Sequence, residues 1–277
     1  MPATIRPGKP FGVEITGATG ASLADPVAAQ ECRALLDEHG VVIYRESHIA
    51  DADLVAFTRL LGEPVRARTG EHRLPEIETI TLDPAKTDVV LASYRKGNFH
   101  WHIDGATLAV PQQATLLTAR EIDESGGDTE FANTFLAYEA LPEPEKQRID
   151  GLRVHHSFAA AQSLANPAPT DADRAAWAKV PSRIHPLVWT HRDGRRSLLI
   201  GATADHVVDL PIPEGRALLT RLLEWATRPR FSYRHQWRRG DLVIWDNTGM
   251  LHRAVEFEPT ARRLMHRTTL TGVEAVA

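Results

Sequence analysis

Two side chains suited to metal binding stand two positions apart in the middle of the chain. They are His102 and Asp104, within Asn98-Phe99-His100-Trp101-His102-Ile103-Asp104. Residues i and i+2 of a strand point to the same side, so we expect this imidazole and this carboxylate to project together. They would supply two-thirds of the two-His, one-carboxylate set of non-haem Fe(II) oxygenases. Taken alone, the pair also fits a purely structural polar contact.

A second polar segment lies towards the C-terminus. A strand expected over Leu242–Trp245 ends in a turn-forming Asp-Asn-Thr-Gly stretch, and His252 follows it. Arg263 and Arg267 come later and would share one face of an extended segment. A guanidinium group can bind a carboxylate through two N–H groups, which suits these residues to an anion. A solvated basic edge strand is the alternative interpretation.

Hydrophobic periodicity predicts the elements that must position these residues. One helix is expected from Asp25-Pro26 to Gly40, with an apolar stripe of Val27, Cys32, Leu35 and Leu36. A buried strand is expected at Val41–Tyr44. A second helix should run from an Asp51 cap to Gly62, with Leu54, Phe57, Leu60 and Leu61 on one face.

Beyond Gly62 the pattern changes to short apolar runs. They predict strands at Ile77–Leu82, Val89–Leu91, His100–Asp104, Ala114–Thr118, Leu187–Thr190, Ser197–Ile200 and Leu242–Trp245. Helices are expected near Leu136–Glu139, Asp171–Lys179 and Pro213–Thr227. Short strands at irregular spacing favour an antiparallel sandwich or barrel. The predicted fold class is therefore mainly β with flanking helices.

Composition limits the class of protein. The 277 residues carry a net charge of -4, which argues against a general nucleic-acid binder. No apolar run approaches the roughly 20 residues that cross a bilayer, and the first residues lack the apolar core of a signal peptide. Cys32 is the one cysteine, so no intrachain disulfide can form. We therefore expect a cytoplasmic protein without a membrane partner.

Taken together, four motifs resemble those of the TauD/TfdA-type dioxygenases, which depend on Fe(II) and 2-oxoglutarate. The motifs are Trp-His-x-Asp at 101–104, Gly-Gly-Asp-Thr-Glu-Phe at 126–131, Trp-Asp-Asn-x4-His at 245–252 and the Arg-rich tail at 262–267. The resemblance extends from Gly12 to that tail. It implies one domain spanning 1–277, with a double-stranded β-helix (jelly roll) fold. It also implies Fe(2+), 2-oxoglutarate and O2 as cofactor and co-substrates.

The resemblance assigns roles residue by residue. His102, Asp104 and His252 match the iron ligands, and Thr129 and Arg263 match the pair that holds the distal carboxylate of 2-oxoglutarate. Asn98 and Arg267 match positions that face the substrate, with the Arg on its anionic head group, and Trp245 matches an aromatic residue near the iron.

Three positions depart from the family pattern. Thr248 stands where the family often has Arg after Trp-Asp-Asn. His100 stands where taurine dioxygenase has Asn, and Ala67 aligns with the His that helps to bind the sulfonate of taurine. These departures argue against taurine as the substrate.

The remaining histidines are expected to be structural. His155 and His156 alternate faces, so one at most points inwards. His185 and His191 lie beside a proline or a charged turn and are predicted at the surface. His235 lies in an expected strand and is interpreted as a packing residue.

The resemblance implies hydroxylation of an unactivated C–H of a small organic anion, with succinate and CO2 as co-products. An aryloxyalkanoate, an alkyl sulfate or sulfonate, and a carboxylate all fit, and assembly into a homo-oligomer stays open. The alternatives are a hydroxylase of an uncharged or larger metabolite, a zinc hydrolase on the same ligands, and a metal-binding jelly roll without oxygenase activity. A structural metal site would have no need of Arg263, which argues against the last alternative.

Overall fold

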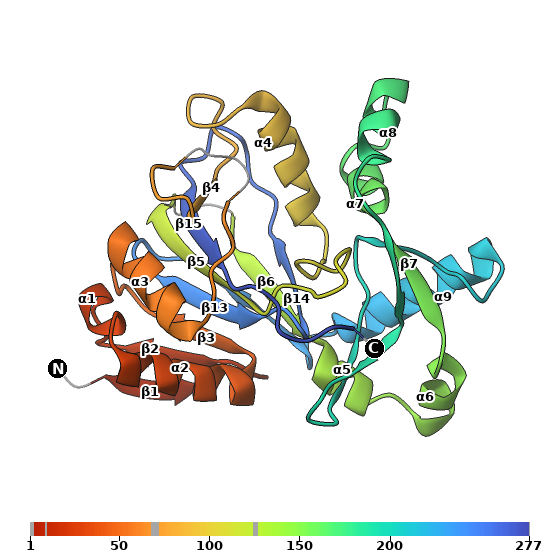
Figure 1. The fold of residues 1–277 in the computed structure, drawn as a ribbon, viewed down its shortest axis with the longest axis horizontal. Coiled ribbons are helices and arrows are strands. Elements are labelled where there is room, and N and C mark those ends of the chain that lie inside the picture. Colours follow the sequence, from red (N-terminus) through yellow and green to blue (C-terminus); the bar gives the residue numbers. More distant parts are fainter. Residues whose placement is uncertain (1–2, 9, 68–71, 124–126, 277) are drawn as a thin grey trace.

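The computed structural model of the chain describes residues 3–8, 10–67, 72–123 and 127–276 (Figure 1). Its helices are α1 Gly20–Leu23, α2 Pro26–His39, α3 Asp51–Leu61, α4 Val89–Arg95, α5 Thr134–Glu139, α6 Glu143–Ile149, α7 Phe158–Ala165, α8 Asp171–Trp177 and α9 Ile212–Ala226, with a 3-10 helix η1 at Lys96–Phe99.

The strands of the described residues form two principal sheets. The larger sheet has the order β1 Thr4–Pro7, β2 Val13–Thr16, β3 Val41–Tyr44, β13 Leu242–Asp246, β5 Ala114–Glu121, β15 Leu264–Thr269 and β4 Glu78–Ile80. The smaller sheet has the order β12 Ser232–His235, β6 Thr129–Asn133 and β14 Met250–Ala254. Two further groups are β11 Ala204–Val207, β7 Arg153–His156 and β8 Arg183–Pro186, and the pair β10 Arg196–Leu198 and β9 Val188–Thr190.

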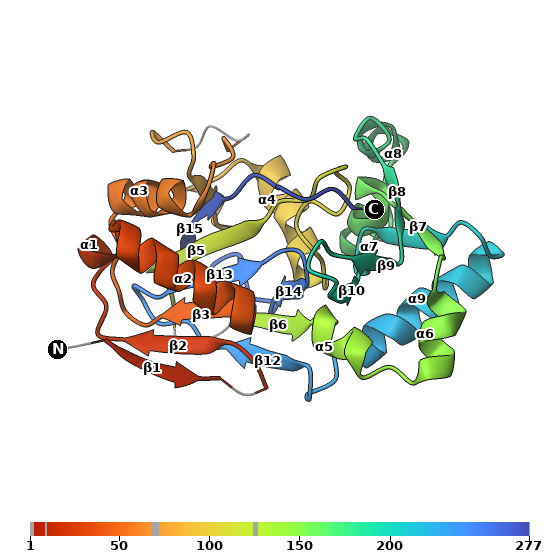
Figure 2. The ribbon, with the colours of Figure 1, turned by 60° about the horizontal axis from the view of Figure 1, so that its bottom comes forward.

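The central strands of the larger sheet are buried on both faces. Alternate residues of β3 and β13 belong to two different apolar cores, as the period of two requires. Val41, Ile43, Val243 and Trp245 belong to the core that the larger sheet shares with the smaller sheet. The core under α1, α2 and α3 takes Val42, Tyr44, Leu242 and Ile244 (Figure 2). This double burial explains why both strands are unbroken apolar runs in the sequence.

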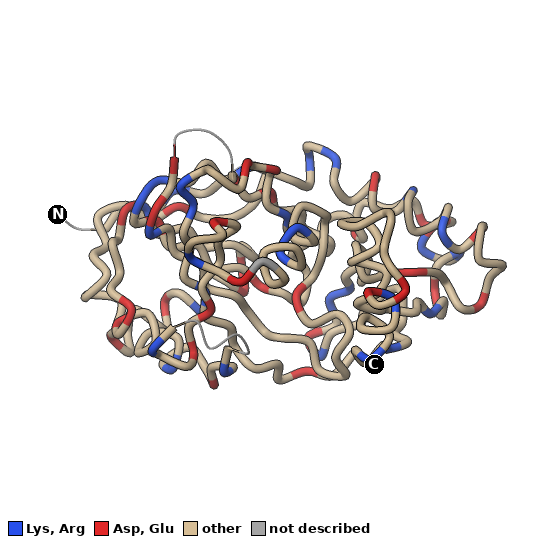
Figure 3. The backbone as a smooth tube through the Cα atoms, turned by 90° about the horizontal axis from the view of Figure 1, so that it is seen from above, with Lys and Arg blue, Asp and Glu red and all other residues tan. Residues whose placement is uncertain are grey.

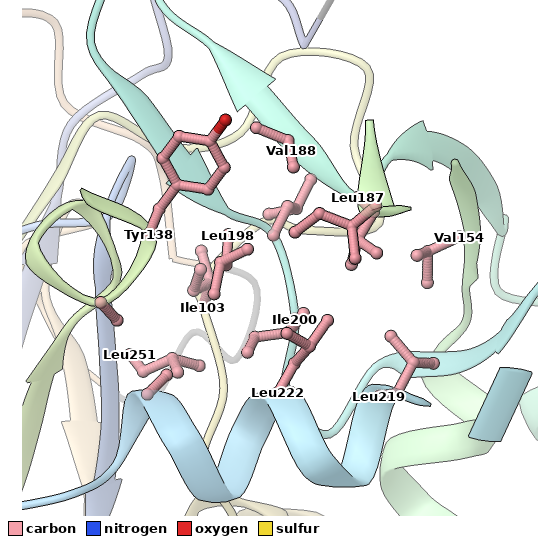
Figure 4. Packing of buried hydrophobic residues seen from close by; sticks show 14 of the residues in the cluster. Ile103, Tyr138, Val154, Leu187, Val188, Leu198, Ile200, Leu219, Leu222 and Leu251 are labelled. Carbon is pink, nitrogen blue, oxygen red and sulfur yellow. The ribbon is translucent and has the colours of Figure 1, made fainter. Parts of the chain in front are cut away.

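A third core lies beyond the smaller sheet, around α9. Leu219 and Leu222 of this helix pack with Leu187 and Leu198, and the same cluster includes Ile103 and Leu251 (Figure 4). Ile103 is the residue between His102 and Asp104, and Leu251 precedes His252. The two segments that carry the candidate metal ligands are therefore anchored in one apolar core.

Several predicted elements are confirmed. The coarse prediction of a mainly β fold with flanking helices agrees with the sheets and helices above. The Asp25 carboxylate accepts hydrogen bonds from the N–H groups of Val27 and Ala28, so it caps α2 as predicted. The side chain of Val27, however, is 63% exposed and lies off the apolar stripe. The second helix begins one residue earlier than predicted, since Ala50 and not Asp51 is its N-cap.

Two predicted strands are wrong. Val89–Leu91 is the start of α4, because the Asp88 carboxylate accepts hydrogen bonds from the N–H groups of Val90 and Leu91 and caps a helix there. His100–Asp104 follows the 3-10 helix η1 and forms one isolated β-bridge, through His102, in place of a strand. In both cases the preceding segment, the Asp88 cap or the 3-10 helix η1, outweighs the preference of these residues for a strand.

The surface positions predicted for His185 and His191 are also wrong. Both side chains are buried, because each finds a polar partner inside the fold. Nε2 of His185 lies 2.9 Å from the carbonyl oxygen of Leu108, and Nε2 of His191 lies 2.9 Å from Oγ of Ser197. His235 packs in β12 beside Trp237, in keeping with its predicted packing role.

Charged residues of both signs are interspersed along the backbone (Figure 3). Among the described residues, no helix combines the length and the apolar character that spanning a bilayer requires.

The core between the two sheets gives a first prediction. Phe131 is fully buried, with its ring centroid 5.4 Å from that of Trp245 and 5.6 Å from that of Tyr233. Phe131→Ala would leave a cavity there and should lower the free energy of unfolding by about 3–5 kcal/mol in a urea titration. The control Val273→Ala, at a side chain that is 66% exposed, should change it by less than about 0.5 kcal/mol. If both variants unfolded at the same urea concentration, Phe131 would not have the packing role described here.

Candidate functional site

Two backbone hydrogen bonds bring the two halves of the candidate metal site together. The N–H of His102 donates to the carbonyl oxygen of His252 at 3.0 Å, and the N–H of His252 donates to the carbonyl oxygen of His102 at 2.9 Å. The imidazole centroids are 4.2 Å apart. This antiparallel bridge fixes side chains that lie far apart in the sequence on the same side of the smaller sheet.

A glycine permits the close packing of this bridge. Gly201 has φ +116°, and a Cβ there would lie 2.7 Å from the carbonyl oxygen of Trp101 and 3.2 Å from Cα of His102. The N–H of Ala202 donates to the same carbonyl oxygen of Trp101 at 2.7 Å. A larger residue at 201 would therefore displace the segment that carries His102.

The donor atoms of the three candidate ligands converge. Nε2 of His102 lies 3.9 Å from Oδ1 of Asp104, Nε2 of His252 lies 3.7 Å from Oδ2, and the three ligand atoms fall within 4.8 Å of one another. Nδ1 of His102 lies 2.8 Å from the carbonyl oxygen of His100, and Nδ1 of His252 lies 3.4 Å from that of Met250. These carbonyls hold the ring protons on Nδ1, so both Nε2 lone pairs face the carboxylate.

The protonation states at pH 7 also suit a metal. Burial lowers the pKa of His252 to about 3, which keeps this imidazole neutral. Burial alone would raise the pKa of Asp104, but the positive charge of Arg267 and a hydrogen bond from Thr115 hold it well below its ordinary value. A metal needs neutral imidazoles and ionised carboxylates as ligands. This donor set therefore fits Fe(II) as the resemblance implies.

Two residues behind Asp104 complete the site, and the sequence assigned neither of them a role. Oγ1 of Thr115 in β5 donates to Oδ2 of Asp104 at 2.9 Å, and Nδ2 of Asn247 donates to Oγ1 of Thr115 at 2.9 Å. Asn247 belongs to the Trp-Asp-Asn motif, which was a usable signal. Thr115 stands in an ordinary strand pattern, and nothing in the sequence distinguishes it.

The departure at Thr248 has a local explanation. Its N–H and its hydroxyl both donate to Oδ1 of Asp246, at 2.9 Å and 2.7 Å. Burial nevertheless raises the pKa of Asp246 to about 6. Thr248 thus fixes the turn between β13 and β14 by hydrogen bonds to Asp246.

An inner cavity of about 50 Å³ brings most of the predicted site residues together. It is lined by Ile80, Asn98, His102, Leu117, Thr129, Trp245, His252, Ala254, Arg263 and Arg267. Asp104 is not among these lining residues, but its carboxylate oxygens lie 3.9 Å from Nε2 of His102 and 3.7 Å from Nε2 of His252, which are. The residues that the sequence assigned to metal, co-substrate and substrate therefore meet in one place.

Arg263 is a buried cation in this cavity. Among the described residues it has one hydrogen bond, from Nε to the carbonyl oxygen of Gly127 at 3.1 Å, and no carboxylate oxygen within 4.0 Å. Burial lowers its pKa to about 10, so it stays charged at pH 7. A Cβ on Gly127 would lie 2.6 Å from Cδ of Arg263, which explains the glycine in the Gly-Asp-Thr motif. The preceding Gly126 lies outside the described residues.

Thr129 faces the same cavity from β6. Its Oγ1 accepts a hydrogen bond from Nε1 of Trp237 at 3.0 Å, and the side chain is buried. Since an acceptor lone pair is already used, the hydroxyl proton is available to donate into the cavity. Thr129 and Arg263 together thus offer a neutral and a charged donor to an anion.

Arg267, in contrast, already has a carboxylate partner. It stands opposite Glu78 in the β15–β4 register, and its Nε and Nη2 donate to Oε2 of Glu78 at 3.1 Å and 2.5 Å. Its Nη1 also lies 3.5 Å from Oδ2 of Asp104. Burial would lower the pKa of Arg267, but these two carboxylates raise it above its ordinary value. Nothing in the sequence assigns a role to Glu78.

A larger cavity of about 780 Å³ lies beside the inner one. Ala254 lines both cavities. Phe99 and Arg253, which line the outer cavity, directly follow Asn98 and His252, which line the inner one. Its polar lining includes Lys96, His100, Arg234, Arg253, Glu256 and Glu258. A cavity of this size accommodates a small organic molecule.

Known proteins are similar to this chain over most of its length. The family model "Taurine catabolism dioxygenase TauD, TfdA family" matches residues 4–269. The chain belongs to the TauD/TfdA family. It is 35% identical to an alpha-ketoglutarate-dependent 2,4-dichlorophenoxyacetate dioxygenase of Burkholderia sp. (strain RASC), over 89% of this chain and 86% of that protein. It is 32% identical to an alkylsulfatase of Acinetobacter baylyi, over 95% of this chain and 82% of that protein.

A solved structure supports the same conclusion. The crystal structure of AAD-2 in complex with Mn(II) and N-oxalylglycine superimposes with a TM-score of 0.82 at 29% identity and covers all of both chains. The chain is therefore a 2-oxoglutarate-dependent dioxygenase, an oxidoreductase that uses Fe(II), 2-oxoglutarate and O2.

The hydrogen bond from Thr115 to Asp104 gives a second prediction. Thr115→Val keeps the shape of the side chain but removes the donor, so the Asp104 carboxylate loses its fixed orientation. Loss of such a partner should weaken metal binding by about 10- to 100-fold, as measured by anaerobic Fe(II) titration. Thr118→Val, at a buried hydroxyl of the same strand without a hydrogen-bond partner in the described structure, is the matched control. Unchanged Fe(II) affinity in Thr115→Val would contradict this role.

Proposed function

We propose that this dioxygenase hydroxylates an unactivated C–H of a small organic anion bound in the outer cavity, with His102, Asp104 and His252 holding the iron. The observation that carries the proposal is the convergence of two imidazoles and one carboxylate beside a buried arginine that lacks a carboxylate partner in the described structure. Such a combination fits a metal and a dianion in one site.

When bound, iron and 2-oxoglutarate supply the oxidation: one atom of O2 enters succinate as CO2 leaves, and the other enters the substrate C–H as a hydroxyl group. The residues of the chain bind, orient and shield. The carbonyls of His100 and Met250 hold the ring protons of His102 and His252 on Nδ1, and Thr115 holds the Asp104 carboxylate. Trp245, 2% exposed with its centroid 4.7 Å from that of His252, excludes water from one side.

The distal carboxylate of 2-oxoglutarate is assigned to Arg263 and Thr129. Arg263 offers a guanidinium group with one hydrogen bond to the described protein, and Thr129 offers a hydroxyl proton. A buried cation is costly without a counter-charge, so the anion would stabilise a site that is already formed. Phe257, whose ring centroid is 4.9 Å from Cζ of Arg263, helps to cover the guanidinium group.

The substrate is assigned to the outer cavity and to the adjoining inner cavity, which Asn98 and Arg267 line. The relatives named above act, by their names, on 2,4-dichlorophenoxyacetate and alkyl sulfates, and both are small organic anions. Arg267 supplies a cation to the inner cavity, but Glu78 occupies two of its donors. We propose that the substrate anion shares or displaces the Glu78 carboxylate, so that Glu78 tunes affinity for anions.

The finer description of the fold is also a proposal. The larger sheet and β12-β6-β14 share an apolar core, an arrangement that fits the two faces of a double-stranded β-helix (jelly roll). The family match over residues 4–269 supports a single domain spanning 1–277. A buried, lone Cys32 is in keeping with a reducing cytoplasm.

Ligation by His252 can be tested by spectroscopy. Anaerobic addition of Fe(II) and 2-oxoglutarate should give a visible metal-to-ligand charge-transfer band, and His252→Ala should abolish it by removing one of three ligands. His100→Ala is the matched control and should keep the band. Loss of the band in His100→Ala together with its retention in His252→Ala would show that the ligand assignment is wrong.

Arg263→Ala should weaken 2-oxoglutarate binding. Removing one partner of a buried charge pair costs about 2–5 kcal/mol, which is roughly 30- to 5000-fold in affinity. Arg263→Lys should restore part of this loss, because an ammonium group cannot reproduce the guanidinium fork. The affinity is read from a 2-oxoglutarate titration of the charge-transfer band. Wild-type affinity in Arg263→Ala would exclude this role.

The Arg267–Glu78 pair is tested with two opposite variants. Arg267→Ala should raise the KM for 2,4-dichlorophenoxyacetate or hexyl sulfate at least about tenfold, equivalent to about 1.4 kcal/mol, while 2-oxoglutarate affinity stays near wild type. Glu78→Gln should lower that KM, because it releases Arg267 from its internal carboxylate. Both are measured as succinate formation at saturating Fe(II), since Arg267 also contacts Asp104. A raised KM in Glu78→Gln would contradict the proposal that Glu78 and the substrate anion compete for Arg267.

A further inference from the structure

A second cluster of two histidines and an aspartate lies where β7 meets β11, away from the cavities described above. Oδ2 of Asp205 is 3.0 Å from Nδ1 of His206 and 3.8 Å from Nδ1 of His155, and the three atoms lie within 4.8 Å of one another. β7 is on the right of Figure 1, whereas β5 and β15 of the larger sheet are on the left. The cluster is therefore not part of the iron site.

An irregularity of the strand pairing creates this cluster. Asp205 and His206 are neighbours in β11, and neighbours in a regular strand point to opposite faces. The register shifts here: Ala204 pairs with His156 and His206 pairs with His155, which leaves Asp205 as the extra residue of a bulge. A bulge redirects side chains, and this one places both Asp205 and His206 beside His155.

One donor atom of the cluster lacks a partner. Nδ1 of His155 is buried and makes no hydrogen bond within the described structure. A buried nitrogen without a partner costs about 1–3 kcal/mol, and a ligand at this point would remove that cost. The three side chains are nevertheless 24–28% exposed, so an ion from solvent can reach the cluster.

We propose that His155, Asp205 and His206 form a binding site for a divalent transition metal of the Zn²⁺ class. Tetrahedral Zn²⁺ with bonds of about 2.0–2.1 Å places its donors roughly 3.3 Å apart, and the separations of 3.0 Å and 3.8 Å lie on either side of this value. A water molecule would complete the coordination.

The neighbouring Arg216 is compatible with this site. Its Nη2 lies 2.5 Å from Oδ1 of Asp205, so Oδ2 stays directed at the two imidazoles. A carboxylate ligand held through its second oxygen is a common arrangement around protein-bound metals. Arg216 would therefore act as a positioning residue for Asp205.

A third cluster of the same composition provides the matched control. It contains Asp51, His72 and His266, whose ligand atoms also lie within 4.8 Å of one another. Here both imidazoles have hydrogen-bond partners, whereas in the cluster around Asp205 only His206 has one among the described residues and Nδ1 of His155 has none. The N–H of Leu74 donates to Nδ1 of His72 at 3.0 Å, which puts the ring proton on Nε2, and Arg120 contacts both Asp51 and Nδ1 of His266. We expect no zinc binding there.

The test counts bound Zn²⁺ by equilibrium dialysis at micromolar ZnCl₂ and neutral pH. Wild type should bind two equivalents, and His102→Ala/His252→Ala, which removes the proposed iron site, should bind one. In that background His155→Ala and, independently, Asp205→Asn should each weaken the remaining site at least tenfold and abolish the zinc-induced rise in Tm. His72→Ala should change neither.

Two outcomes would overturn the proposal. One is that the double variant binds no zinc at all. The other is that its zinc is lost in His72→Ala and kept in His155→Ala. Circular dichroism of each variant without metal confirms that a loss of zinc is not a loss of folding. The charge-transfer experiment on His252→Ala is independent of this site, so the two proposals fail or hold separately.

Discussion

The site depends on one short contact, the pair of backbone hydrogen bonds between His102 and His252. Neither residue gains its position from its own element alone: His102 lies in an irregular segment, and His252 lies in β14 of the smaller sheet. The bridge joins them, and the burial of Ile103 in the core around α9 keeps the irregular segment in place. Backbone pairing and apolar packing therefore supply the precision that a metal site requires.

Charge balance is the second constraint on the site. Asp104 must stay ionised although its side chain is only 13% exposed, and Arg267 makes this feasible through a contact of 3.5 Å. Arg267 would in turn leave an excess positive charge in the interior without Glu78. The three groups form one electrostatic unit in which each charge reduces the desolvation cost of the next. A residue assigned to the substrate thus also supports the metal ligand.

The sequence predicted the parts of this structure that depend on local chemistry. Spacing and motif order singled out His102, His252 and Arg263, which line one cavity, and apolar runs located most of the strands and helices. It missed what depends on distant partners. Asp88 caps a helix where the apolar run predicted a strand. Thr115 and Glu78 have roles only because the folded sheet places them beside Asp104 and Arg267. Residue type alone carries no signal for such contacts.

Composition also does not decide which polar cluster can bind a metal. Three groups of two histidines and one aspartate occur in the described structure, and an arginine touches the aspartate in each. The groups around Asp104 and Asp51 differ in where the imidazole protons are held. Backbone carbonyls hold them on Nδ1 of His102 and His252, whereas a backbone N–H forces the proton of His72 onto the nitrogen that faces its aspartate. The hydrogen-bond partner of the outer ring nitrogen therefore determines whether a lone pair is free for a ligand, and that partner is set by the backbone fold.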